Sequence, residues 1–308
     1  MLKRFLMLLF LLGSWAGVPI LALTASSSSS PEGKSEIRVM TFNVKVDFEE
    51  DSRVPPWDDR KDLCAQVVKE ARPDLLGLQE TSPNQLAFFQ DLLEGYETVG
   101  KTPLPSEERE LFETLFPPLK EIGFDSYTDV ILMIRKEVFE ILDQGHWWLS
   151  PTPDKASIGF GNIFPRITVW ARLKHTPSGR EIVAVNTHFD NTAPSQERMA
   201  KLCQEKLQIF VDEDLPILFF GDFNTDQGRG DYPLLTSGGW KDSYLASPEA
   251  SETGRDDNVP TIGGRSRIDH IFYYGKSLQA VEWKRLESPD PKRALSDHFP
   301  VLSVLAID

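Results

Sequence analysis

The segment Pro216-Ile217-Leu218-Phe219-Phe220-Gly221-Asp222-Phe223-Asn224 combines a strand-like apolar run with a polar turn. Its apolar part is short, aromatic and bounded by turn residues, which predicts a strand over 217–220 that is buried on both faces. The charged end of such a strand must lie at a rim, because burying Asp222 without a metal, a donor or water is costly. Gly221 permits a close backbone turn, and Asp222 and Asn224, two residues apart, project to the same side.

Four other short polar clusters follow strand-like runs in the same way: Thr41-Phe42-Asn43, Gln79-Glu80, Asn186-Thr187-His188 and Ser296-Asp297-His298. A shared cation is the simplest explanation when several strands end in such groups. Mg²⁺ favours one or two carboxylates together with water and substrate phosphate, and Glu80 beside the Asn43 amide supplies that minimum. Each cluster alone could merely cap a loop, so the prediction of one composite site rests on their joint occurrence.

The order of predicted elements favours two packed sheets with helices outside, because many strands have few helices between them. A doubly wound parallel sheet does not fit this order. Strands are predicted over 37–46, 75–79, 130–135, 146–149, 166–174, 181–187, 217–220, 268–274, 278–286 and 300–306, and helices over 58–71, 83–93 and 195–212. The segment 103–125, rich in Glu and Pro, is predicted to be a surface excursion with one helix, over 107–115.

The N-terminus has the layout of a secretory signal peptide over residues 1–25, with Lys3 and Arg4, an apolar stretch over 5–23 and small residues after it. We therefore expect a secreted or periplasmic protein. An uncleaved membrane anchor is the alternative, because the apolar stretch is about as long as a minimal transmembrane span. A flexible Ser-rich linker is predicted over 26–35, followed by one catalytic domain over 36–308.

The charge balance argues against an extended polynucleotide as substrate. The chain has 33 basic and 47 acidic residues, a formal net charge of −14, and no basic block. Proteins that grip nucleic acid without sequence preference normally use a Lys/Arg surface. Only two cysteines, Cys64 and Cys203, are present, and both fall within amphipathic helical patterns, so we expect small buried apolar groups rather than a disulfide.

Hydrolysis by a metal-activated water is the leading reaction, because the sequence has no Gly-x-Ser-x-Gly, no Walker-type Gly-rich loop and no His-Glu-x-x-His motif. Asp222 can take a proton from water, and Asn224 can hold that water or a phosphate oxygen. His298 can polarise a phosphoryl oxygen, and Asp269 is suited to orient an imidazole. The other histidines, His146, His175 and His270, are interpreted as structural.

These residues resemble, in the same order along the chain, the motifs of the endonuclease/exonuclease/phosphatase superfamily with the DNase-I-like fold. The resemblance rests on Thr41-Phe42-Asn43, Gln79-Glu80, Asn186-Thr187-His188-Phe189-Asp190, Gly221-Asp222-Phe223-Asn224, Arg267-Ile268-Asp269 and Ser296-Asp297-His298. It implies a four-layered α/β sandwich and a phosphoesterase that depends on Mg²⁺ (or Mn²⁺).

The same resemblance implies roles for individual residues. Glu80 would bind the metal, assisted by Asn43 and Asp297. Asp222 would activate the attacking water, and Asn224 would hold that water or the substrate. His188 and His298 would stabilise the charge on the phosphoryl group, and Asp269 would pair with His298 in preference to His188.

Within the superfamily the chain looks most like the exported bacterial phosphodiesterase-like branch, on features such as Trp57 and Phe164-Pro165-Arg166. Arg166 is a candidate substrate contact and Asp190 a candidate supporting acid. Relatives commonly carry a Glu before the strand at 130, where this chain has Asp129. We expect a monomeric phosphoesterase that acts on a small phosphorylated substrate or lipid head group. The alternatives are a secreted nuclease and, from another class, a non-catalytic binding protein of the same fold.

Overall fold

The computed structural model describes residues 35–47, 53–100, 110, 114, 130–162, 164–192, 194–248, 260–263 and 266–308. The predicted signal segment, nearly all of the linker, Asp129 and the 103–125 excursion except Glu110 and Thr114 lie outside the described residues. The described part of the chain belongs to one compact unit, Lys34–Asp308.

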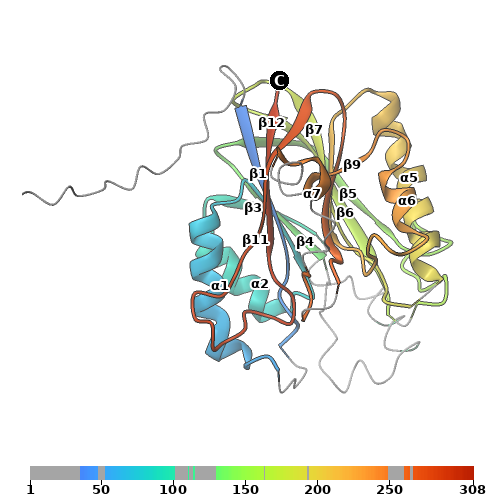
Figure 1. Ribbon diagram of the computed structural model, residues 1–308. Coiled ribbons are helices and arrows are strands. Elements are labelled where there is room, and N and C mark those ends of the chain that lie inside the picture. Colours follow the sequence, from blue (N-terminus) through green and yellow to red (C-terminus); the bar gives the residue numbers. More distant parts are fainter. Residues whose placement is uncertain are drawn as a thin grey trace, which may run out of the picture. The chain divides into compact units, whose positions relative to one another are not determined.

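Two six-stranded mixed sheets face each other, and helices cover their outer faces (Figure 1). The first sheet has the strand order β11 (Leu278–Arg285), β12 (Val301–Ile307), β1 (Ser35–Asn43), β2 (Leu75–Gln79), β4 (Val130–Arg135) and β3 (Tyr96–Val99). The second has the order β5 (Phe139–Trp148), β6 (Ile167–His175), β7 (Glu181–His188), β8 (Ile217–Asp222), β10 (Asp269–Tyr274) and β9 (Lys241–Asp242). The predicted four-layered, DNase-I-like α/β sandwich is confirmed.

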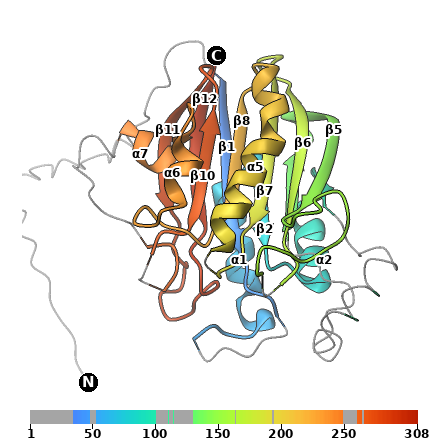
Figure 2. The ribbon, with the colours of Figure 1, turned by 90° about the vertical axis from the view of Figure 1, so that its right-hand side faces the viewer.

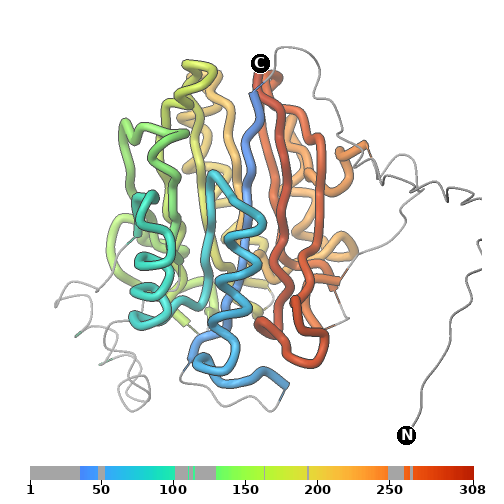
Figure 3. Tube along the Cα trace, turned by 90° about the vertical axis from the view of Figure 1, so that its left-hand side faces the viewer, coloured from blue at the N-terminus to red at the C-terminus, as the bar shows by residue number. Residues whose placement is uncertain are grey.

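The helices bury one apolar face each against a sheet. Figure 3 shows α1 (Trp57–Ala71) and α2 (Pro83–Leu92) over the first sheet, and Figure 2 shows α5 (Ser195–Asp212) over the second. Strand β1 illustrates the period of two, because Ile37 and Val39 join the core between the sheets while Met40 and Phe42 pack under α1 and α2. Two shorter helices, α6 (Tyr232–Thr236) and α7 (Ser243–Ala246), follow β8.

Local signals in the sequence explain where the helices begin and end. Helix α2 starts with a capping box, in which Ser82 and Gln85 satisfy each other's backbone N–H groups, and with Pro83 in its first turn. Helix α1 ends at Arg72, which has a left-handed backbone conformation, directly before Pro73. Among the described residues, no helix is both long and apolar enough to cross a membrane.

A buried polar contact joins the two sheets beneath the rim at which β1, β2, β7 and β8 end. The Asn186 amide on β7 donates to the backbone carbonyls of Leu78 (3.1 Å) and Ile131 (2.8 Å) in the opposite sheet, and its Oδ1 accepts from Gln79 Nε2 at 2.7 Å. Gly77 makes this approach possible, since a Cβ there would lie 2.7 Å from Asn186. The contact holds the ends of the strands in fixed relation.

Most predicted elements lie within one or two residues of the observed ones, and 75–79, 130–135 and 195–212 match in full. Strand β5 begins at Phe139, seven residues before the prediction, because it is an outer strand whose polar residues face solvent. The short elements β3, β9, α6 and α7 were not predicted. Both cysteines are free and buried, as expected.

Candidate active site

The sheet registers bring the polar strand ends into two facing rows. In the second sheet, His188, Asp222 and Asp269 are direct neighbours, because β7 pairs His188 with Asp222 and β10 pairs Asp269 with Asp222. In the first sheet, Asn43 pairs with Gln79, so that Glu80 follows at the same rim. Segments far apart in the sequence therefore meet at one edge of the sandwich.

Asn43 links the two rows. Its Nδ2 donates to Glu80 Oε1 and to Asp222 Oδ2, both at 3.0 Å, while its Oδ1 accepts the backbone N–H of Lys45 at 3.0 Å. Glu80 has a left-handed backbone, with φ of 54°, which is uncommon for a residue with this side chain and typical of functional sites. Burial alone would raise the pKa of Glu80, but His188, Lys45 and the Asn43 amide lower it below its usual value.

Asp222 lies between the two histidines. Its Oδ2 is 3.5 Å from His188 Nε2 and 3.7 Å from His298 Nε2, and its side chain is almost completely buried. Burial raises the pKa of Asp222, and the attraction of His298 offsets this only in part. A carboxylate with a raised pKa is a better proton acceptor near neutral pH than an ordinary one.

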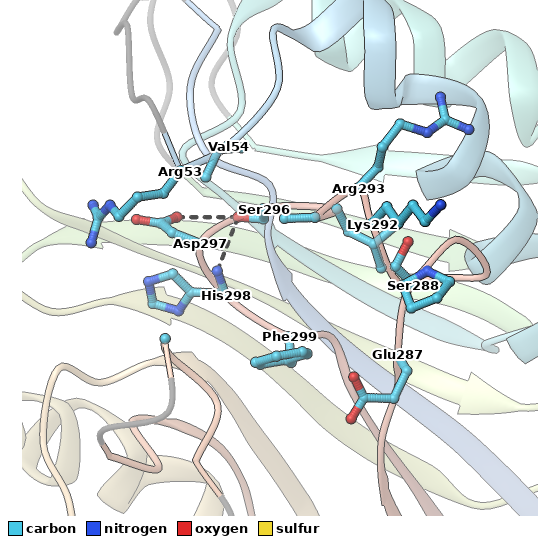
Figure 4. A pocket seen from close by; sticks show the side chains of 14 residues that line it. Arg53, Val54, Glu287, Ser288, Lys292, Arg293, Ser296, Asp297, His298 and Phe299 are labelled. Carbon is cyan, nitrogen blue, oxygen red and sulfur yellow. Dashed lines mark hydrogen bonds between the residues drawn. The ribbon is translucent and has the colours of Figure 1, made fainter.

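His298 is oriented by Asp269. Its Nδ1 lies 2.9 Å from Asp269 Oδ2, which places Nε2 toward Asp222. Burial lowers the pKa of His298, but the carboxylates of Asp269 and Asp222 outweigh this and raise it to about 10. Its neighbour Asp297 is half-buried and accepts a hydrogen bond from the Ser296 hydroxyl (Figure 4).

His188 is held in a different way. The guanidinium of Arg166 donates from Nη1 to His188 Nδ1 at 2.8 Å. Because a guanidinium can only donate, Nδ1 must accept, and the ring proton therefore lies on Nε2, facing Asp222. Arg166, predicted to contact substrate, is itself buried, and its Nε lies 3.8 Å from Asp190.

The turn after β8 fixes Asn224. Gly221 has φ of 148°, and a Cβ there would lie 2.0 Å from the Thr187 carbonyl oxygen, so only glycine fits. The Asn224 backbone N–H donates to Asp222 Oδ1 at 2.9 Å, and its side-chain amide donates to the Phe189 carbonyl at 2.9 Å. The turn thus holds Asn224 beside Asp222, as the two-residue spacing predicted.

Two buried arginines support the site, and sequence reasoning gave neither of them a role there. Arg60 on α1 donates to the carbonyls of Val44, Lys45 and Leu295, and so connects the segment after Asn43 with the one before Asp297. In the sequence Arg60 follows Trp57 by three residues, and in the structure its guanidinium lies over the Trp57 ring, 5.0 Å from the centroid.

Arg267 anchors the start of β10. It lies 2.8 Å from Asp242 and donates to His270 Nδ1 at 2.7 Å. His270 Nε2 therefore carries the proton and donates to the Thr225 carbonyl at 2.8 Å, which ties the turn after Asp222 to β10. No local pattern marks Asp242 as the partner, because the pair forms only when β9 adds to the sheet.

The donor set suits a divalent cation. Among the described residues, Asp222, Asp269 and His298 each offer one ligand atom, and these atoms lie within 4.8 Å of one another. Glu80 adds a carboxylate from the opposite sheet, joined to Asp222 through Asn43. Carboxylates gathered in a buried site repel one another, and a cation would relieve that repulsion.

Comparisons with known proteins agree with this architecture. The model of the Endonuclease/Exonuclease/phosphatase family matches residues 40–298. An endonuclease/exonuclease/phosphatase family protein from Bacteroides thetaiotaomicron has a similar structure, with 27% identity, a TM-score of 0.71, and coverage of 89% of this chain and 99% of that one. The mannosyl-6-phosphatase of the same organism is similar too, with 27% identity, a TM-score of 0.71, and coverage of 87% and 99%.

An uncharacterized protein of Acanthamoeba polyphaga mimivirus is 27% identical over 287 residues, which cover 87% of this chain and 99% of the viral protein. The family match spans the rim from β1 to the loop before β12 and therefore takes in nearly the whole compact unit. On this match, the chain belongs to the endonuclease/exonuclease/phosphatase family.

Proposed function

We propose that the protein is a phosphoesterase that hydrolyses a phosphomonoester or phosphodiester with the help of Mg²⁺ or Mn²⁺. The observation that carries the proposal is the position of Asp222, which is buried between two histidines and linked through Asn43 to Glu80. This arrangement offers a base, two N–H donors and carboxylate ligands within one rim, which is what phosphoryl transfer to water requires.

Two groups of residues would hold the cation. Glu80 would be the principal ligand on the side of the first sheet, with Asn43 and Asp297 assisting. The atoms of Asp222, Asp269 and His298 would offer a second position only with His298 deprotonated, which is an alternative to its role as a proton donor. A bound divalent cation supplies charge neutralisation at phosphate oxygens and lowers the pKa of a bound water.

The protein's own groups divide the remaining work. Asp222 accepts a proton from the attacking water as the new bond between oxygen and phosphorus forms, and the ester bond breaks to release the alcohol, whose oxygen takes a proton from solvent. His298, kept protonated by Asp269, and His188, with its proton on Nε2, donate to phosphoryl oxygens as negative charge builds up there. Asn224 holds the water or a phosphate oxygen.

We propose a small substrate, because the net charge of −14 opposes binding of a polynucleotide. The similarity to a mannosyl-6-phosphatase supports a small phosphorylated molecule, and a lipid head group fits the same description. Export is part of the proposal and rests on the sequence pattern of residues 1–25. A monomeric state is proposed with it. Expression with the intact N-terminus, followed by N-terminal sequencing and size-exclusion chromatography, tests both points.

Hydrolysis assays test the function directly. Chromogenic phosphomonoesters and phosphodiesters are incubated with Mg²⁺, Mn²⁺ or chelator, with wild-type protein and with Asp222→Ala and His298→Ala. We expect metal-dependent turnover that both substitutions reduce by about 10² or more. Turnover that persists in chelator, or that both folded variants retain, would overturn the proposal.

A further inference from the structure

A cavity of about 580 Å³ lies directly beside His298. Val54, Ala294, Leu295 and Phe299 are apolar residues of its lining, and His298, whose Nε2 lies 3.7 Å from Asp222, lines it too (Figure 4). Pockets for small organic ligands have volumes of roughly 300–1,000 Å³, whereas a phosphate group alone needs far less. The cavity therefore has room for the organic part of a phosphoester whose phosphate lies at the rim.

Phe299 offers a fixed aromatic surface in this cavity. Its backbone N–H donates to the Thr261 carbonyl at 2.7 Å, and the guanidinium of Arg285 stacks on its ring at 4.4 Å. Arg285 is in turn held by Glu287 at 3.1 Å and by the Pro260 carbonyl at 2.9 Å. The ring is thus set before any ligand arrives, and a preorganised surface binds at a lower entropic cost.

The lining of the cavity carries charges of both signs, with Arg53, Lys292 and Arg293 as its basic residues and Glu287 and Asp297 as its acidic ones. Arg53 and Lys292 are exposed residues that line it. Arg293 also lines it, but its guanidinium is bonded to Asp290 and to the Asp59 carbonyl. With three basic and two acidic residues, this lining is slightly more basic than the protein as a whole, which favours the approach of a small anionic substrate.

On the basis of the proposed function, we propose that this cavity binds the leaving group of the substrate and that this group contains a ring that stacks on Phe299. A flat aromatic surface buries more of a ring than of a flexible chain, which would also lose rotational freedom. The substrate class is therefore a phosphoester of a cyclic alcohol, either a sugar or a nucleoside, rather than of a straight-chain alcohol such as a lipid head group.

The test compares ring and chain substrates: glucose 6-phosphate and adenosine 5′-monophosphate against glycerol 3-phosphate and phosphoethanolamine, each as monoester and as methyl diester. The readout is the ratio of kcat/KM for ring and chain substrates, which cancels any general effect of a substitution on the nearby His298. We expect the wild type to prefer the ring substrates and Phe299→Leu to reduce the ratio about tenfold. Comparison of glucose 6-phosphate with adenosine 5′-monophosphate then shows whether the ring belongs to a sugar or to a nucleoside.

Two further variants serve as controls for the loss of the Phe299 ring. Phe299→Tyr keeps the ring and should keep the preference, while Phe88→Leu makes the same change on α2, away from the cavity, and should leave the ratio unaltered. Equal use of ring and chain substrates by the wild type, or an unchanged ratio in Phe299→Leu, overturns the cavity assignment and leaves the proposed function standing.

Binding of non-hydrolysable phosphonates separates the two proposals. Thermal shifts are measured with cyclohexylmethylphosphonate and n-hexylphosphonate. If no ester is hydrolysed but the cyclic phosphonate binds more tightly, and Phe299→Leu removes that difference, the proposed function fails and the cavity assignment is supported. Equal binding of the two phosphonates contradicts the cavity assignment.

Discussion

Replacing Asp269 with asparagine removes the negative charge beside His298 and keeps the volume of the side chain. Asp269 Oδ2 lies 2.9 Å from His298 Nδ1. Opposite unit charges roughly 4 Å apart attract by roughly 4 kcal/mol at an effective dielectric constant of 20, which corresponds to roughly three pKa units. Since the pKa of His298 is raised to about 10 in the wild type, we expect it to fall to near 7 in Asp269→Asn.

The assay is an NMR titration of the His298 ring in chelator-treated protein, with Asp143→Asn on β5 as a control for an exposed carboxylate. The Asp269→Asn variant should also lose about 10²- to 10⁴-fold in kcat/KM with metal present. Because folding raises the pKa of His298, the stability that it contributes is complete below pH 6.5 and is lost as pH rises toward 10. A wild-type His298 that titrates near 6.5, or an Asp269→Asn variant with wild-type activity, would show that Asp269 does not keep His298 protonated for catalysis.

The structure makes two further predictions about stability, both measured by urea denaturation. Gly221→Ala should lower the free energy of unfolding by about 3 kcal/mol or more, because the new Cβ would meet the Thr187 carbonyl. Gly95→Ala is the control, since a Cβ there meets nothing within 4 Å. Equal stability of the two variants would contradict this prediction. Burial raises the pKa of Asp242, but Arg267 and the other neighbours of Asp242 hold this pKa well below its usual range. The stability that Asp242 contributes is therefore present above pH 4 and is lost as pH falls. Asp242→Asn should therefore lower the free energy of unfolding by about 3–5 kcal/mol at pH 7 and by progressively less below pH 4. A decrease in this free energy that does not depend on pH would argue against the ion pair of Asp242 with Arg267.

Long apolar or strongly periodic segments made the fold predictable. The run over 217–220 and the amphipathic pattern over 195–212 each identify one element without reference to the rest of the chain. The two-residue strand β9 carries no such signal, because it forms only by pairing with β10. The prediction missed the first seven residues of β5. Three successive residues of this part, Leu142, Asp143 and Gln144, are exposed, so the sequence lacks the alternation of apolar and polar residues expected of a half-buried strand.

The candidate site was predictable where polar residues follow strands directly. The position of Asp222 relative to His188 follows from register alone, because adjacent parallel strands end at the same rim. The contacts of the arginines that support these residues were not predictable from the sequence. Arg60 reaches Leu295 across 235 positions of sequence, and Arg267 finds Asp242 only in the folded sheet. The position of Arg166 behind His188 also depends on packing rather than on sequence spacing.

We propose that the rim hydrolyses phosphoesters with a divalent cation held on the side of Glu80. The most direct measurement is kcat/KM for a chromogenic phosphoester as a function of Mg²⁺ and Mn²⁺ concentration, for wild type, Glu80→Gln and the exposed control Glu97→Gln. We predict no turnover in chelator, wild-type behaviour for Glu97→Gln, and about a 10²-fold or greater loss for Glu80→Gln that high metal concentrations restore in part. Turnover in chelator, or a Glu80→Gln variant that matches Glu97→Gln at every metal concentration, would contradict it.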